Sequence, residues 1–164
     1  MSNPKELMNH IPQVGKVEWI SIRPERGADV RELDAVEVNA ETGLVGDRYN
    51  TKSGKRQVTL IQSEHLEAVG KILGKDKIDP AKTRRNIVVS GINLLALKEK
   101  QFQIGEVILE MTGNCHPCSK MEKNLGPGGY NAMRGHGGIT ARVIRGGIIR
   151  KGDEVKLISE ESKN

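Results

Sequence analysis

Short runs rich in Val, Ile and Leu, separated by glycine, proline or polar turns, recur along this sequence and constrain its fold most. Such β-branched and apolar runs, with turn residues between them, are typical of strands. Only two segments have the periodicity and end signals of helices. A chain of many short strands and few helices indicates a strand-rich α+β domain, and we expect a mostly antiparallel β-barrel, closed or half-closed, with one or two flanking helices. The predicted strands are residues 14–22, 35–40, 56–62, 86–90, 107–111, 139–144 and 154–158.

Local signals place the helices and one turn. Residues 63–73 carry an apolar stripe at helical spacing, with Ser63 as the predicted cap and Gly74 just past the end. Asp79 followed by Pro80 has the cap-then-proline form of a second, short helix. The pair at 146–147, two glycines between apolar runs, predicts a two-residue hairpin.

The chain length and the composition of the terminal segments predict one domain. The 164 residues are close to the roughly 150 expected of a single domain. We expect an amino-terminal arm at 1–13, one domain at 14–158 and a polar tail at 159–164. No run is long and apolar enough for a membrane-spanning helix. The first ten residues lack the apolar stretch of a secretion signal, so a cytoplasmic protein is expected.

Composition argues against nucleic acid as a partner. The chain has one Trp, two Tyr and one Phe, too few rings for a platform that stacks bases. Lys and Arg number 26 against 21 Asp and Glu, and the resulting charge of +5 is ordinary for a domain of this size. The sequence has no Lys/Arg-rich tract and no recognition-helix pattern.

The sharpest chemical feature is Cys115-His116-Pro117-Cys118, which directly follows a predicted strand. Two thiols at this spacing fit a redox pair, although the surrounding βαβ pattern of such proteins is missing. They also fit half of a zinc site, in which His136, distant in sequence, would be a further ligand. A third interpretation is one reactive or metal-ligating thiolate with the other cysteine incidental, and a fourth is two small residues packed at a strand end.

Two further segments have the composition of anion sites. Residues 126–138 (GPGGYNAMRGHGG) allow backbone N–H groups to form an anion nest, with Arg134 adding a charge, or else form a surface loop. Arg84, Arg85 and Asn86 lie at the start of a predicted strand, where guanidinium forks bind phosphate or carboxylate. Their alternative role is that of solvated charges.

The order of these segments resembles the MOSC domain, the family named for the carboxy-terminal part of molybdenum cofactor sulfurases. The resemblance covers roughly residues 14–158 and is to small stand-alone bacterial members. It is carried by residues 42–48 (TGLVGDR), 56–66 (RQVTLIQSEHL), 85–91 (RNIVVSG) and the Cys-His-Pro-Cys segment.

The resemblance implies a β-barrel fold and a pocket for the molybdenum cofactor (molybdopterin). It places the family's important cysteine, a metal ligand in reducing members and a proposed sulfur carrier in sulfurases, on Cys118. The family's Arg–x–Asn falls on Arg84 and Asn86. We predict that the cofactor-binding residues converge beside Cys118, and we expect them to be Arg84, Arg85, Asn86, Gly128, Gly129, Arg134 and His136. Arg48 and Arg56 are weaker candidates for the same pocket. Their alternative role is an ion pair with Asp47 or Glu64.

Three functions fit this implied site. The first is a molybdenum-dependent reductase of N-hydroxylated compounds, with Cys118 as metal ligand and an electron-transfer protein as partner. The second is a sulfur carrier or transferase that holds a persulfide on Cys118, with Cys115 able to resolve it. Its partner would be a cysteine desulfurase, and pyridoxal phosphate would enter only through that enzyme. The third is a cofactor-binding module without turnover. The oligomeric state is not predicted.

Overall fold

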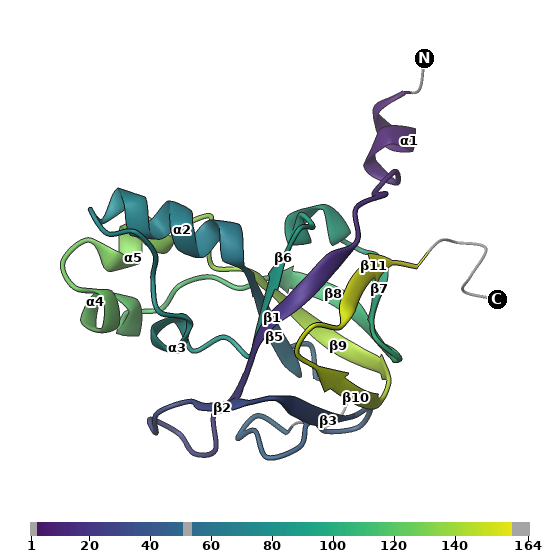
Figure 1. The fold of residues 1–164 in the computed structure, drawn as a ribbon, viewed down its shortest axis with the longest axis horizontal. Coiled ribbons are helices and arrows are strands. Elements are labelled where there is room, and N and C mark those ends of the chain that lie inside the picture. Colours follow the sequence, from purple (N-terminus) through teal and green to yellow (C-terminus); the bar gives the residue numbers. More distant parts are fainter. Residues whose placement is uncertain (1–2, 51–53, 159–164) are drawn as a thin grey trace.

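A computed structural model describes residues 3–50 and 54–158, so the predicted tail at 159–164 lies outside the described residues. Within these ranges the chain forms eleven strands, five short α-helices and one 3-10 turn. Helix α1 (Pro4–Met8) has no buried residue and projects away from the rest of the chain (Figure 1). No helix in the described ranges is long and apolar enough to cross a bilayer.

Seven strands close into a barrel in the order β11-β7-β8-β9-β5-β6-β1, because β1 also pairs with β11. Every neighbouring pair is antiparallel except β5 and β6. The expected mostly antiparallel barrel in a strand-rich α+β domain is therefore confirmed. The barrel strands are β1 (Gly15–Ile22), β5 (Val58–Gln62), β6 (Ile87–Ser90), β7 (Gln101–Ile104), β8 (Val107–Asn114), β9 (Ile139–Arg145) and β11 (Glu154–Leu157).

A short strand and a small sheet complete the β-structure. Strand β2 (Arg31–Leu33) pairs with the end of β1. A second sheet joins β10 (Gly147–Arg150), β3 (Ala35–Asn39) and β4 (Gly43–Leu44). Gly146 and Gly147 do not form the predicted hairpin, since β9 pairs with β8 and β5 whereas β10 pairs with β3. The two glycines instead carry the chain from the barrel to the second sheet.

The parallel pair arises because two helices separate β5 from β6. Helix α2 (Ser63–Ile72) follows β5 without a loop, and α3 (Pro80–Thr83) precedes β6. Because the strand runs directly into α2, the residue before the helix is Gln62, and Ser63 is not the cap as predicted. Asp79 does cap α3, accepting a hydrogen bond from the Ala81 amide (3.0 Å).

Two apolar cores result from this arrangement. One fills the barrel and includes Leu60 and Phe102, both fully buried. The other lies between the outer side of β5 and β6 and the helices, and includes Ile61, Leu66 and Met121. Successive residues of a strand point to opposite faces, so Leu60 enters one core and Ile61 the other. Helices α4 (Lys120–Leu125) and α5 (Gly129–Met133), together with α2, gather on this side of the barrel (Figure 1).

Candidate functional site

Five segments that are far apart in sequence meet in one hollow of about 110 Å³. The end of β1 and the starts of β5 and β6 lie together because β1 is antiparallel to β6 and β5 is parallel to it. The segment after β4 and the loop after β8 supply the remaining walls. The hollow, named here the arginine hollow, is lined by Arg23, Arg48, Arg56, Arg84, Arg85, Cys118, Lys120 and Met121.

The arginine hollow carries a strong positive charge. Its lining holds five arginines and one lysine and no acidic residue. Arg48 and Lys120 are exposed and Arg56 is half-buried, and the side chains of all three have no hydrogen-bond or ion-pair partner among residues 3–50 and 54–158. Guanidinium forks suit phosphate or carboxylate, and cations gathered in one place attract an anion. The side chains of the hollow therefore have the charge and the donors that suit an anionic ligand.

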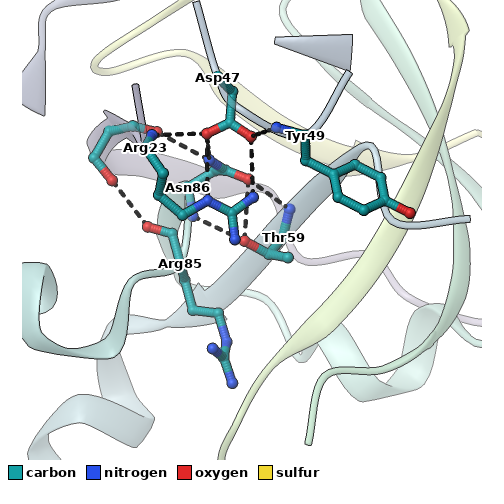
Figure 2. A network of polar contacts seen from close by, with 7 residues as sticks. Arg23, Asp47, Tyr49, Thr59, Arg85 and Asn86 are labelled. Carbon is teal, nitrogen blue, oxygen red and sulfur yellow. Dashed lines mark hydrogen bonds and ion pairs between the residues drawn. The ribbon is translucent and has the colours of Figure 1, made fainter. Parts of the chain in front are cut away.

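Arg23, which lines the hollow, belongs to a buried polar network centred on Asp47 (Figure 2). The Asp47 carboxylate is fully buried and pairs with the Arg23 guanidinium (Nη2 to Oδ2 3.0 Å, Nε to Oδ1 3.3 Å). It also accepts the backbone N–H groups of Arg23 (2.7 Å) and Tyr49 (3.2 Å). A fifth donor is the Asn86 amide (3.3 Å). Asp47 thus ties the end of β1 to the segment after β4 and to the start of β6.

Asn86 belongs to this network and is not free for a ligand. It is fully buried, and its Oδ1 accepts from the amide (3.0 Å) and hydroxyl (3.1 Å) of Thr59. Its Nδ2 donates to the Ser21 carbonyl (3.1 Å) and to Asp47. All four hydrogen-bonding positions of the amide are used within the protein. The structure thus leaves the Asn86 side chain no free donor or acceptor for the expected contact with a cofactor.

Arg84 is partly open to a ligand. Its backbone is left-handed (φ 59°), and its Nη1 donates to the Ala28 carbonyl (2.7 Å) while the side chain lines the arginine hollow. Arg84 also lines a neighbouring hollow of about 410 Å³, together with Asp29, Val30, Ala81, Lys82 and Asn124. The two hollows therefore meet at Arg84.

Arg85 holds the loop that carries the cysteines in place through hydrogen bonds to backbone carbonyls. Its buried guanidinium donates to the carbonyls of Gly137 (2.7 Å), Thr83 (3.0 Å), His116 (3.4 Å) and Cys115 (3.5 Å). Burial lowers the pKa of this guanidinium, and the thiols of Cys115 and Cys118 act in the opposite direction. Arg85 thus places a positive charge beside both thiols and fixes the loop that presents Cys118.

The two cysteines differ sharply in access. Cys118 is exposed and lies on the rim of the arginine hollow. Cys115 is buried, with 2% of its surface accessible, and its backbone N–H donates to the Gly138 carbonyl (2.8 Å). Both thiols are free. Of the two thiols, Cys118 is therefore the more accessible to a ligand.

The predicted anion nest at Gly128 and Gly129 is filled by the protein itself. The Glu122 carboxylate accepts the N–H groups of Gly128 (2.9 Å) and Tyr130 (3.0 Å), and these bonds lower the pKa of Glu122. Gly129 packs so tightly against α4 that an added Cβ would lie 2.7 Å from the Met121 carbonyl oxygen. The two glycines join α4 to α5 and do not line the arginine hollow with Cys118.

Arg134 and His136 also lie outside the arginine hollow. Arg134 lines a separate hollow with His116 and Tyr130. The His136 ring meets the His65 ring edge-on (centroids 5.0 Å apart), and its buried Nδ1 has no hydrogen-bond partner among the described residues. Burial and, secondly, His136 lower the pKa of His65. Neither residue lines the arginine hollow with Cys118, although Arg134 shares its hollow with His116 and Pro117, the two residues before Cys118.

The residues that replace them were only partly visible in the sequence. Arg48 and Arg56 line the hollow as the weaker prediction had it, and neither pairs with Asp47 or Glu64. Arg23 and Lys120 were missed. Arg23 lies between the first strand and Pro24, where an arginine looks like an ordinary turn residue. Its place in the hollow depends on the buried ion pair with Asp47, which the sequence does not show.

Comparison with known families now adds to this geometry. Residues 38–156 match the family described as the MOSC domain. The chain belongs to the MOSC domain family. No curated protein matches it closely enough to count as a relative.

Solved structures of MOSC-type proteins have the same fold as this MOSC protein. The crystal structure of the YuaD protein from Bacillus subtilis has a TM-score of 0.78 at 20% identity, over 90% of this chain and 98% of that one. YiiM from Geobacillus stearothermophilus gives 0.70 at 16% identity, over 88% of this chain and 75% of that one. YiiM from Escherichia coli gives 0.67 at 18% identity, over 88% and 70%. At these identities the likeness concerns the fold alone.

Proposed function

We propose that this MOSC protein binds the molybdenum cofactor and serves as a reductase of N-hydroxylated compounds, with Cys118 as the protein's ligand to the metal. One observation supports the proposal above all. The single exposed thiol of the described chain lies on the rim of a hollow lined by five arginines and one lysine. A soft thiolate ligand beside an anion site suits a cofactor that joins a metal to a phosphate-bearing pterin.

The size and charge of the region fit such a group. The arginine hollow, at about 110 Å³, matches a phosphate or metal-bearing end and not a whole pterin. The adjoining hollow of about 410 Å³, reached past Arg84, adds room for the rest. When bound, the molybdenum centre supplies the two-electron removal of oxygen from nitrogen, and an electron-transfer partner returns the electrons.

The chain's own residues then have distinct roles. Arg48, Arg56 and Lys120 hold the anionic part, because their donors have no other partner in the described chain. Arg23 contributes charge from a fixed position, since Asp47 holds its guanidinium through two hydrogen bonds. Arg85 is a positioning residue that acts through the backbone of the cysteine loop.

Expression in a host that makes molybdopterin tests this proposal. We expect the purified protein to carry molybdenum and pterin in equal amounts, measured by elemental analysis and by fluorescence of the oxidised pterin. Lys120→Gln should lower both. Lys123→Gln is the matched control, because Lys123 lies on the same helix and outside the hollow. A folded protein without molybdenum and pterin, or equal loss in both variants, contradicts the proposal.

A sulfur carrier is the second candidate function, because an exposed Cys118 could also hold a persulfide delivered by a cysteine desulfurase. The burial of Cys115 counts against its role as the resolving thiol, since an attacking thiolate needs access to the disulfide or persulfide sulfur. Cyanide-labile sulfur on the purified protein, in the absence of molybdenum, would favour this function over the reductase. A binding module without turnover would carry the cofactor and reduce no N-hydroxylated compound.

A further inference from the structure

Consecutive residues of the cysteine loop line two different hollows. Cys118 lines the arginine hollow, whereas His116 and Pro117 line a second one of about 570 Å³ with Tyr130, Arg134 and Gly135. This second hollow, named here the Tyr130 hollow, shares no lining residue with the arginine hollow. Its volume is in the range of small-molecule sites. A molecule bound there contacts the residue immediately before Cys118.

The floor of the Tyr130 hollow continues toward Cys115. A narrower hollow of about 140 Å³ shares His116, Pro117 and Gly135 with it and extends to Leu95, Asn114, Cys115, Gly137 and Gly138. Neither hollow has an acidic residue in its lining. Arg134 gives the wider hollow its positive charge, and Leu95, Pro117 and Tyr130 give the depression apolar surface.

The polar side chains around the Tyr130 hollow are uncommitted. The side chains of His116, Tyr130 and Arg134 have no hydrogen-bond or ion-pair partner within the described ranges. Tyr130 exposes 41% of its surface. A guanidinium fork binds a carboxylate or phosphate through two parallel hydrogen bonds. The faces of Tyr130 and Pro117 offer apolar surface on which a flat ring packs.

Contacts within the chain hold part of the backbone around this hollow, although the segment is rich in glycine. Glu122 fixes the start of α5 through the amides of Gly128 and Tyr130. An added Cβ at Gly137 would lie 2.1 Å from the Cys115 carbonyl oxygen, so this part of the segment rests directly on the cysteine loop. Backbone that is held in this way loses less entropy when a ligand binds.

We propose that the Tyr130 hollow is the substrate site of this protein and that it selects a substrate with a flat ring and an anionic group. Arg134 binds the anionic group, and the ring packs between Tyr130 and Pro117. The position of the hollow, one residue from Cys118, brings such a molecule beside the proposed metal site. The word substrate rests on the function proposed above, whereas the binding itself does not.

Titration of metal-free protein with benzoate, followed by amide NMR shifts, tests the binding. We expect shifts at Tyr130, Arg134 and Gly135, and a roughly tenfold or larger loss of affinity in Arg134→Gln, as for removal of a charge-assisted hydrogen-bonded pair. Arg26→Gln is the matched control, because Arg26 is exposed and lines neither hollow. Benzamide, which has the ring without the charge, should bind more weakly than benzoate.

Shifts confined to the arginine hollow, or equal losses in Arg134→Gln and Arg26→Gln, would overturn the proposal. In protein loaded with cofactor, Arg134→Gln should raise KM for 4-carboxybenzamidoxime by a larger factor than KM for benzamidoxime, whereas Arg26→Gln should change neither. Failure of the benzoate titration refutes the Tyr130 hollow as a site. Benzoate binding at Tyr130 without reduction of either amidoxime instead refutes the reductase and leaves the binding site in place.

Discussion

Replacement of Asp47 by Asn tests whether the buried network holds the arginine hollow together. The carboxylate is fully buried and accepts five donors, two of them from the Arg23 guanidinium. Asparagine keeps the shape and one acceptor oxygen. Its amide nitrogen would then face donors, and the Arg23 charge would remain buried without an anion.

The expected loss of stability follows from that unpaired charge. Breaking one partner of a buried ion pair costs about 3–5 kcal/mol, and the hydrogen bonds retained by asparagine place this variant near the lower end. At about 2–4 °C per kcal/mol for a chain of this size, we expect a fall in Tm of about 10 °C. The Arg23→Met, Asp47→Asn double variant should recover part of it, because the buried Arg23 charge is removed while the asparagine oxygen still accepts a hydrogen bond.

Urea unfolding followed by circular dichroism measures the effect as a shift in midpoint at constant slope. Glu32→Gln is the control, because the Glu32–Lys151 ion pair (3.4 Å) is exposed and its removal should cost less than about 1 kcal/mol. A loss below about 1 kcal/mol in Asp47→Asn, or a loss no larger than that of Glu32→Gln, would refute the argument that this ion pair is a buried structural unit.

Three further predictions concern the helices and the glycine-rich segment. The pKa of Glu122 is lowered in the folded protein from its ordinary value of 4.5, so the hydrogen bonds of its carboxylate stabilise the fold fully above pH 4.5. This stabilisation is lost as the pH falls through the lowered pKa. The Tm of the wild type should therefore exceed that of Glu122→Gln at neutral pH, and the difference should vanish in acid; a difference that persists in acid refutes this. Gly138→Ala should unfold the protein or destabilise it by more than about 3 kcal/mol, because its Cβ would overlap the Leu60 carbonyl oxygen. Gly135→Ala has an equally positive φ with open space around it and should cost only about 1–2 kcal/mol in thermal unfolding, so equal losses would contradict the steric argument. Arg85→Lys should lower the free energy of unfolding in urea by about 2–4 kcal/mol, since lysine cannot bridge the carbonyls of Gly137 and Thr83. A change close to zero would refute the role of Arg85 in fixing the cysteine loop.

Six of the seven barrel strands were predictable because they are buried on at least one face, which leaves an apolar pattern in the sequence. Strand β7 was missed, because it has only four residues, of which only Phe102 and Ile104 are buried. Strand β5 is buried throughout, and its run of β-branched residues is correspondingly clear. Strands β2, β4 and β10 are short, and β2 and β10 are largely exposed, so they left no such pattern. The Gly146–Gly147 hairpin failed because a turn signal is local, whereas the pairing of β10 with β3 spans more than a hundred residues.

The site was predictable only in its chemistry. Cys118 and the arginines beside it have the residue types of an anion and metal site, and the structure brings Arg84 and Arg85 to the same hollow as Cys118. Asn86 has the right type and lies next to them, yet its donors and acceptors are used by residues from three other segments. Which polar groups satisfy one another inside the protein depends on tertiary contacts that spacing does not encode.

The molybdenum content of two cysteine variants, purified from a host that makes molybdopterin, tests the central claim most directly. Both thiols are free, but Cys118 is exposed on the arginine hollow and Cys115 is buried. Cys118→Ser should lose the bound molybdenum, and Cys115→Ser should retain most of it, with both variants folded by circular dichroism. Equal loss in the two variants, or full retention in Cys118→Ser, would contradict the assignment of Cys118 as the metal ligand.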